Sequence, residues 1–426
     1  METAGGADHL TIGGIRAGEL AERHGTPLYV YDLAGIVAEA RAIDAAFEGA
    51  PHLIAYAVKA NTAGPIVRAL AQAGCGADVV SGGELQVALA AGVAPDRILY
   101  SGVAKQDDEI RLALGTGDRG ILSLHIESIE EIERVACIAR SMGRRARRSM
   151  GRRARIGLRI NPEIEEVGTH AHVATGHDEA KFGIALADIP TAIERVRAHA
   201  KELDLGGLTG HVGSQFVATD DYRKGAKCLF ALSADLPERA NFRFLDTGGG
   251  FGVDYGDGCN ASPADFVRVA REEQKAAGLD GIPLFVEPGR RIVATHGYLL
   301  ARVIQNKAAK PLPWVFIDAG MNDLIRPALY QARHRIVAAS PCREPTRPCR
   351  VAGPVCESAD DFGTHELPSD VTLVALRDAG AYGFTMASQY NGRPLAGEVF
   401  VENGAVMAEL PRGDLARWVE GRIGRG

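Results

Sequence analysis

Short apolar runs alternate with helical stretches through the middle of the chain. Each run ends in Gly, Ser, Asn or His, and a segment rich in Ala, Leu and Glu follows it. Eight such runs occur between residues 52 and 290: HLIAYAVKAN, ADVVSGG, RILYSG, LSLHIES, RIGLRINP, LTGHVGSQ, RFLDTGGG and PLFVEPGR. Nearly continuous apolar character is typical of parallel strands that are buried on both faces. The pattern predicts an α/β fold, a TIM-like (β/α)8 barrel over residues 36–292.

A doubly wound parallel sheet is the competing architecture for the same alternation of strands and helices. The distinctive polar residues, however, gather at the C-terminal ends of the runs, as in HVGSQ and DTGGG. Barrel active sites are built at that end of the strands. This placement favours the barrel.

The pattern changes after about residue 292. The runs GYLLARVIQ, WVFIDAG, RIVAAS, TLVALRD and EVFVENGAVM are rich in β-formers, are separated by Pro and Gly, and have little helical periodicity. They predict a second, mostly-β domain over residues 293–426.

Composition narrows the class of protein. The chain has 426 residues, and 51 of them are glycine, about 12% against a usual ~7%. Without low-complexity runs, this excess indicates tight turns and backbone close to a ligand. The net charge of −6 argues against a nucleic-acid partner, since such proteins are usually basic. No apolar run approaches the ~18–20 residues that span a bilayer.

The first residues and the cysteines favour the cytoplasm. METAGGADHL lacks the basic and apolar parts of a signal peptide. The seven cysteines are scattered, and no pair has CxxC spacing, so neither a disulfide framework nor a zinc ribbon is predicted. We therefore expect a cytoplasmic protein.

A lysine and two glycine-rich turns are the candidate chemistry. Lys59 ends the first run, where desolvation would lower its pKa and favour Schiff-base formation; a solvated strand-end lysine is the alternative. DTGGGFG (246–252) and EPGR (287–290) follow the seventh and eighth strands, where such barrels bind phosphate. Glycine N–H groups would hold the anion there. Ser214 in HVGSQ would add a hydroxyl donor.

A lysine opposite a phosphate site predicts pyridoxal 5′-phosphate. This cofactor requires an acid beside its ring nitrogen, and Glu287 is placed for that role. An ion pair between Glu287 and Arg290 is the alternative. His211 would stack on the ring, or cap a strand within a hydrogen-bond network.

Two further features stand outside this site. His170, His172 and His177 in THAHVATGH have metal-ligand spacing, but no acidic or cysteine partner completes a site, so we predict no metal and a solvated loop. RSMGRRAR occurs at 140–147 and again at 148–155. We expect a tolerated surface insertion; a basic patch for phosphate or RNA is the alternative.

The motifs together resemble those of a known family. YAVKAN, HVGSQ, DTGGGFG, EPGR, DAGMNDLIRPALY, GPVCESAD and GAYG occur in this order, and the likeness runs from GTPLYVYD almost to the C-terminus. The chain resembles the diaminopimelate decarboxylases, fold-type III pyridoxal-phosphate enzymes related to ornithine and arginine decarboxylases. The resemblance implies decarboxylation of meso-2,6-diaminopimelate to L-lysine and CO2, the last step of lysine biosynthesis. It also implies a homodimer and a β domain completed by residues 1–35.

The resemblance also implies roles for individual residues. Lys59, His211, Glu287 and Cys356 would be catalytic, Lys59 carrying the cofactor and Cys356 donating a proton across the dimer interface. The other cofactor residues would be Ser214, Gly248, Gly249, Gly250, Pro288, Gly289, Arg290 and Tyr382. The substrate residues would be Arg290, Arg326, Tyr330, Glu357 and Tyr382.

The substrate residues agree with the physics of carboxylate recognition. An arginine fork binds a carboxylate through two hydrogen bonds, so Arg326 with Tyr330 favours a dicarboxylic substrate. A sibling decarboxylase of another amino acid and a non-catalytic pyridoxal-phosphate-binding regulator remain the alternatives. THAHVATG departs from the family's His-Pro-Tyr type of segment, and the duplication is not a family feature.

Overall fold

Two compact units make up the chain. The computed structural model describes residues 10–145, 153–164, 181–256, 258–259 and 261–424. One unit, here the barrel unit, comprises Val37–Asp254 and Gly258–Arg291. The other, here the β unit, comprises Met1–Ile36, Tyr255–Asp257 and Ile292–Gly426. The short segment at Tyr255 joins the β unit although it follows a barrel strand in the chain, which the sequence pattern does not indicate.

Eight parallel strands close on themselves in the barrel unit. In ring order they are β4 (His52–Ala57), β5 (Gly76–Val79), β6 (Ile98–Tyr100), β7 (Ser123–Ile126), β8 (Ala154–Asn161), β10 (Leu203–Gly210), β11 (Phe244–Asp246) and β12 (Leu284–Val286). β12 pairs with β4 and β10 with β8, so the ring has no free edge. The short β9 (Ile184–Ala185) adds to β8 outside the ring. The predicted barrel is confirmed, and a doubly wound sheet, which has two edges, is wrong.

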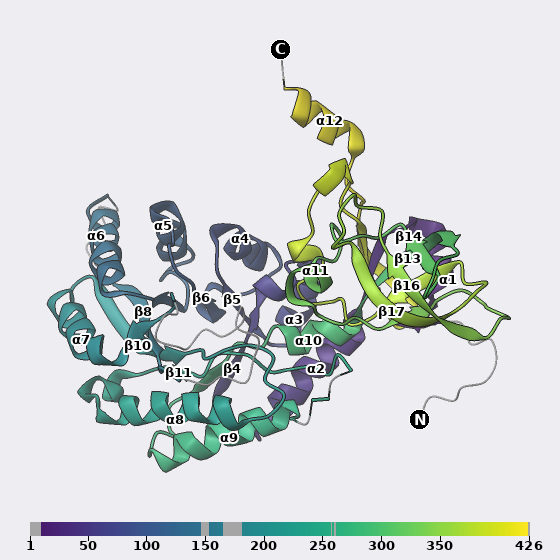
Figure 1. Ribbon diagram of the computed structural model, residues 1–426. Helices are drawn as coiled ribbons and strands as arrows, with labels where there is room; N and C mark the ends of the chain where they lie inside the picture. The colour runs from purple at the N-terminus through teal and green to yellow at the C-terminus, as the bar shows by residue number, and fades with distance from the viewer. Residues whose placement is uncertain (1–9, 146–152, 165–180, 257, 260, 425–426) are drawn as a thin grey trace. The chain divides into compact units, whose positions relative to one another are not determined.

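Helices alternate with the barrel strands and lie around them, the first of them before β4 and the others after it (Figure 1). They are α2 (Leu33–Ala46), α3 (Gly64–Gln72), α4 (Gly82–Ala90), α5 (Asp107–Gly115), α6 (Ile129–Arg145), α7 (Ile189–Ala198), α8 (Asp220–Asp235), α9 (Pro263–Ala276) and the short α10 (Arg290–Val293). The start of α9 shows how the sequence sets a boundary. Ser262 caps the helix in a reciprocal capping box with Asp265, and Pro263 occupies the first turn.

Strands from both ends of the chain form the β unit. β3 (Leu28–Asp32) pairs with β13 (Gly297–Lys307) and with β19 (Gly397–Glu402), so the N-terminal segment completes this unit as expected. The other strands are β14 (Trp314–Ile317), β15 (Ile336–Ala338), β18 (Leu373–Leu376), β20 (Ala405–Leu410) and the short β1 (Thr11–Ile12) and β2 (Ile15–Arg16). The helices are α1 (Ala17–His24), α11 (Arg326–Tyr330) and α12 (Leu415–Ile423).

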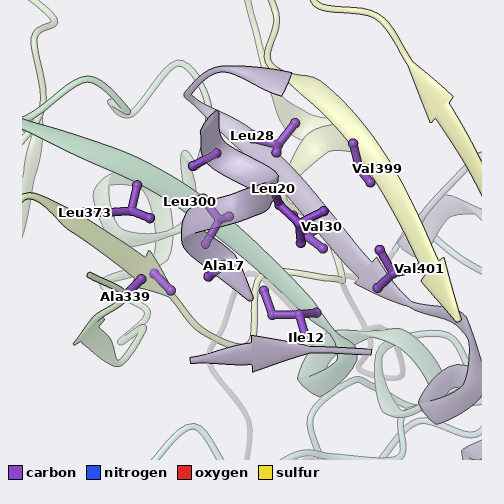
Figure 2. Close-up of a cluster of buried hydrophobic side chains, with 12 residues drawn as sticks. Ile12, Ala17, Leu20, Leu28, Val30, Leu300, Ala339, Leu373, Val399 and Val401 are labelled. Atoms are coloured by element: carbon purple, nitrogen blue, oxygen red, sulfur yellow. The ribbon is translucent and has the colours of Figure 1, made fainter. Parts of the chain in front are cut away.

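Figure 2 shows the buried cluster that joins these distant segments. Leu20 of α1 and Val30 of β3 pack with Leu300 of β13 and Val399 of β19. Residues near both ends of the chain thus share one apolar core.

Two strands of the β unit escape the hydrophobic pattern. β16 (Thr346–Ala352) and β17 (Asp361–Pro368) pair antiparallel over most of their length. β16 reads TRPCRVA and β17 reads DFGTHELP, and 6 of their 15 positions are exposed. Because their apolar residues are few, periodicity alone does not reveal them.

The sequence duplication extends into two regular elements. The first copy continues α6 as far as Arg145, and the second copy enters β8 at Ala154. Residues 146–152 between them lie outside the described residues, as does the predicted loop THAHVATGH. None of the described helices is long and apolar enough to cross a membrane.

A matched pair of glycine substitutions tests the barrel's close packing. A Cβ atom on Gly207 of β10 would lie 2.2 Å from the carbonyl oxygen of Phe244, whereas on Gly83 of α4 it would meet only Ser81 Oγ, at 3.7 Å. We expect Gly207→Ala to lower the free energy of unfolding by about 1–3 kcal/mol through overpacking. Gly83→Ala should raise it by up to about 1 kcal/mol, because Gly is a poor helix former. Urea unfolding followed by circular dichroism measures both, and equal stability of the two variants would contradict this account.

Candidate active site

Polar side chains cluster at the C-terminal ends of the barrel strands. Lys59 lies just after β4, and its Nζ is 2.6 Å from Oδ2 of Asp78 on β5. The Lys59 side chain is 37% exposed, whereas that of Asp78 is fully buried. The lysine therefore faces the open end of the barrel while its partner carboxylate is part of the interior.

Two carboxyl groups lie together in the interior beside this ion pair. Asp246 ends β11 and Glu287 follows β12; both are buried. Their nearest oxygens lie within 4.8 Å of each other and of a His125 nitrogen. Asp246 Oδ1 accepts a hydrogen bond from the Gly248 N–H at 2.8 Å, but Oδ2 has no partner among the described residues. Two ionised carboxylates cannot donate to each other, so a single proton between them would supply the missing bond.

Burial keeps this carboxyl pair protonated. Desolvation and the charge of Asp78 raise the pKa of Asp246 to about 7, although the hydrogen bonds with the Gly248 N–H and with Glu287 oppose this rise. Desolvation and the charges of Asp246 and Asp78 raise the pKa of Glu287 well above its ordinary value. The site therefore presents an acid that holds a proton at neutral pH, as a proton donor to a ring nitrogen must.

His125 of β7 is buried beside the two carboxyl groups and is neutral. Its Nδ1 is 3.1 Å from Ser101 Oγ, and Ser101 Oγ is 3.4 Å from Glu287 Oε1. Desolvation and the nearby charge of Lys105 lower the pKa of His125 to about 3. A neutral imidazole adds no positive charge beside Glu287, so it does not favour loss of the proton from the carboxyl pair.

Two buried ion pairs support the neighbouring strand ends. Arg159 Nη1 of β8 binds Glu127 Oε1 at 2.9 Å, and Lys105 Nζ binds Glu131 Oε1 at 2.8 Å. Burial opposes ionisation of Glu127, but the charges of Arg159 and Lys105 outweigh it and hold its pKa below the ordinary value. Glu127 also accepts hydrogen bonds from the N–H groups of Gly102 and Gly183. It thus joins three loops at the mouth of the barrel.

The predicted phosphate turns have the backbone that such a site needs. Gly248 and Gly250 have φ of +68° and +95°, which other residues rarely adopt, and a Cβ on Gly249 would lie 2.1 Å from the Glu287 carbonyl oxygen. The Gly248 N–H is bonded to Asp246 and the Gly249 N–H to His211 Nδ1. The N–H groups of Gly250 and Gly289 donate no hydrogen bond within the described residues. These two are the donors that an anion could use.

His211 and Arg290 flank these turns. His211 Nδ1 accepts from Gly249, so its proton is on Nε2, and desolvation with the charges of Arg159 and Lys59 holds its pKa well below the ordinary value. Arg290 is buried and donates from Nη2 to Ser214 Oγ at 3.1 Å. Glu287 and Arg290 form no ion pair among the described groups, so the simple pairing of these two is wrong; Glu287 faces Asp246 and Ser101 instead.

The remaining predicted residues belong to the β unit. Arg326 begins α11 and is buried, and Tyr330, at its end, is half-buried. Cys356 and Glu357 are exposed on the turn before β17, where the Cys356 N–H donates to Asn391 Oδ1 at 2.8 Å. Tyr382 has φ of +56° and is half-buried.

Several residues of the barrel site were missed by sequence reasoning. Asp78, His125, Arg159 and Asp246 are polar residues within otherwise apolar strands. In a barrel the interior is filled by inward-facing side chains, so a charged residue inside such a run is itself the signal.

The site fits the pyridoxal phosphate that the resemblance implies. It offers a partly exposed lysine, a buried acid that keeps its proton, and two N–H donors on glycine turns. His125, Asp246 and Glu287 are also spaced for a metal ion. Glu287 could instead donate a hydrogen bond to the ring nitrogen of the cofactor, and the glycine turns beside it suit a phosphate group. We therefore favour the cofactor over a metal ion at this cluster.

Comparisons with known proteins agree with this fit. Residues 33–294 match the family model described as the pyridoxal-dependent decarboxylase, pyridoxal binding domain. The diaminopimelate decarboxylase of Zymomonas mobilis is 39% identical over 399 residues, which cover 92% of this chain and 91% of the relative. That of Pseudomonas aeruginosa is 40% identical over 395 residues, 91% of each.

Solved structures are similar over nearly the whole chain. Diaminopimelate decarboxylase from Helicobacter pylori, in complex with L-lysine, is 37% identical with a TM-score of 0.86, covering 94% of this chain and 98% of that one. The enzyme from M. jannaschii with L-lysine is 32% identical with a TM-score of 0.88, covering 98% and 96%. A lysine/ornithine decarboxylase from Vibrio vulnificus is 22% identical with a TM-score of 0.75, a likeness in fold alone.

The buried carboxyl pair predicts a pH dependence of stability in the cofactor-free protein. Because both folded-state pKa values are raised, the folded chain keeps protons that the unfolded chain releases above about pH 4. The free energy of unfolding should therefore fall as pH rises from about 4 to about 7. Asp246→Asn keeps the acceptor for the Gly248 N–H and removes one titrating group. Over this pH range the free energy of unfolding of the variant should therefore fall by on the order of 2 kcal/mol less than that of wild type.

Urea unfolding of cofactor-free protein at about pH 4 and about pH 7 measures the difference. Asp280→Asn, at an exposed position of the same unit, is the matched control and should behave as wild type. An Asp246→Asn variant with the wild-type pH dependence would refute the shared proton.

Proposed function

The chain belongs to the pyridoxal-dependent decarboxylases, and on that premise we propose that it converts meso-diaminopimelate to L-lysine and CO2. The observation that carries the proposal is the likeness to diaminopimelate decarboxylases, about 40% identity over nine-tenths of the chain. The residues that the resemblance assigns to cofactor and substrate are all present in this sequence.

The cofactor is pyridoxal 5′-phosphate, which when bound draws into its ring the electron pair that decarboxylation leaves on the substrate carbon. We assign Lys59 as the residue that binds it covalently. Glu287, sharing a proton with Asp246, would keep the ring nitrogen protonated. Ser214 and the N–H groups of Gly250 and Gly289 would bind the phosphate.

The other barrel groups orient and shield this centre. His211 is neutral, so it can lie against an aromatic ring without adding charge beside it. Arg290 is held by Ser214, next to the phosphate donors. The ion pair with Asp78 holds the Lys59 amine at the mouth of the barrel, where it would bind the cofactor.

The substrate residues come from the β unit. Arg326 and Tyr330 would bind the distal carboxylate, and Glu357 the distal amino group. A guanidinium binds a carboxylate through two parallel hydrogen bonds. The substrate of a diamine-forming decarboxylase has no distal carboxylate for such a contact. The Cys356 thiol would donate its proton to the carbon that has lost CO2, and Tyr382 would contact cofactor and substrate.

Turnover by the purified chain tests the proposal directly. With pyridoxal phosphate and meso-diaminopimelate we expect equal amounts of CO2 and L-lysine, and little CO2 from ornithine or arginine. Lys59→Ala should lose both turnover and the visible absorption of the lysine-bound cofactor, because no other amine can replace it. Lys201→Ala, at an exposed position of the barrel unit, should match wild type.

Two outcomes would contradict the proposal. Faster CO2 release from ornithine or arginine than from meso-diaminopimelate would favour a sibling enzyme. Cofactor binding without CO2 release from any of the three would favour a non-catalytic regulator.

We further propose a homodimer in which each subunit lends Cys356 to its partner's barrel. Cys356 and Glu357 are exposed on the single chain, although the chemistry requires them beside a buried cofactor. A cytoplasmic location is supported by the seven cysteines, all of them free thiols, since disulfides are rare in reducing compartments.

Mixing two inactive variants tests the shared site. Cys356→Ala removes the proton donor and should lower kcat by about 10²–10⁴. Refolding it together with Lys59→Ala yields hybrid dimers with one intact site, so about a quarter of wild-type activity should return. Cys342→Ala in place of Cys356→Ala is the control and should itself be active. If the mixture stays inactive although hybrids form, the thiol acts within its own chain.

A further inference from the structure

A buried histidine lies against the guanidinium of Arg326. Arg326 is 5% exposed and His334 4% exposed. Arg326 Nη1 and His334 Nε2 are 2.9 Å apart. Gln331, with φ of +55°, turns the chain after α11, which lets His334 lie back beside the start of that helix.

Two hydrogen bonds of His334 indicate its protonation state. Its Nδ1 is 3.0 Å from the Arg377 carbonyl oxygen, an acceptor, so Nδ1 carries a hydrogen. A guanidinium only donates, so His334 Nε2 must accept from Arg326. His334 is therefore neutral, and it links the arginine to the backbone that follows β18.

An aromatic ring holds the guanidinium from a second side. The Arg326 guanidinium carbon lies 4.7 Å from the centre of the Tyr255 ring, and the Tyr255 and His334 rings meet edge to face at 5.7 Å. Tyr255 is 8% exposed. The hydrogen bond from Arg326 to the His334 imidazole fixes the rotation of the guanidinium within its plane. The face of the Tyr255 ring fixes only the orientation of that plane.

We propose that His334 is a positioning residue for the substrate's distal carboxylate: it holds Arg326 in the orientation that binds this group. The inference rests on the proposed function, in which Arg326 binds that carboxylate. A preoriented fork loses less conformational entropy on binding than a free side chain would. His334 acts through Arg326 rather than on the reacting carbon, so its loss should change substrate binding and not the chemical step.

Three substitutions separate this role from packing. His334→Phe keeps a ring against Tyr255 but removes both nitrogens. His334→Asn keeps a donor for the Arg377 carbonyl and is too short to reach Arg326, so it serves if the Phe variant does not fold. His334→Gln places an acceptor near the position of Nε2 and should restore binding.

We expect the Phe and Asn variants to raise KM for meso-diaminopimelate about tenfold, since a hydrogen bond to a charged group is lost. Their kcat should stay within about twofold of wild type, and the Gln variant should lie close to wild type in both. His365→Leu, a half-buried histidine on β17 whose Nε2 bonds the Phe362 carbonyl oxygen, is the matched control and should leave KM unchanged.

Ligand binding provides a readout that needs no turnover. L-lysine keeps the distal carboxylate, and cadaverine has none. The dissociation constant of L-lysine should rise in the Phe and Asn variants by about the same factor as KM, and that of cadaverine should not change.

Distinct results overturn the inference and the proposed function. An unchanged KM in the Phe and Asn variants, a fall in kcat alone, or equal weakening of L-lysine and cadaverine would show that His334 only supports the fold. Failure of the proposed function appears in the wild type itself, as no CO2 from meso-diaminopimelate and no binding of L-lysine.

Discussion

The burial of charge inside a closed barrel is the constraint on which the rest of the site depends. Moving an ionised group out of water is costly unless an opposite charge or a proton compensates it. The barrel unit uses both solutions. Lys59, Arg159 and Lys105 are paired with carboxylates, whereas Asp246 and Glu287 lie close together and burial raises the pKa of both, which favours a proton on the pair.

That constraint explains why one carboxyl group can act as an acid at neutral pH. An isolated glutamate near the surface would be ionised. Behind β11 and β12, with Asp246 and Asp78 close by, Glu287 keeps its proton. The surrounding ion pairs Arg159–Glu127 and Lys105–Glu131 hold the loops that close off this interior, so the electrostatics and the loop structure support each other.

The β unit meets the same constraint in a different way. Arg326 is buried, and a neutral histidine and an aromatic face contact its guanidinium. Neither of these two contacts brings a negative charge to the arginine, and the directed hydrogen bond fixes its orientation. Buried side chains of the barrel unit thus favour a proton on Glu287, and buried side chains of the β unit orient the charge of Arg326.

Strand periodicity, glycine turns and motif order predicted the barrel, the second β domain and most of the candidate residues, because these are local properties of the chain. The sequence by itself did not reveal β16 and β17, whose partly exposed positions carry little pattern. Nor did it show that Tyr255 joins the β unit. The partners of Glu287 and Arg326 were decided only by the tertiary structure. Asp246 is about forty positions from Glu287 along the chain, and a side chain's partner there depends on strand register in three dimensions, which no local pattern encodes.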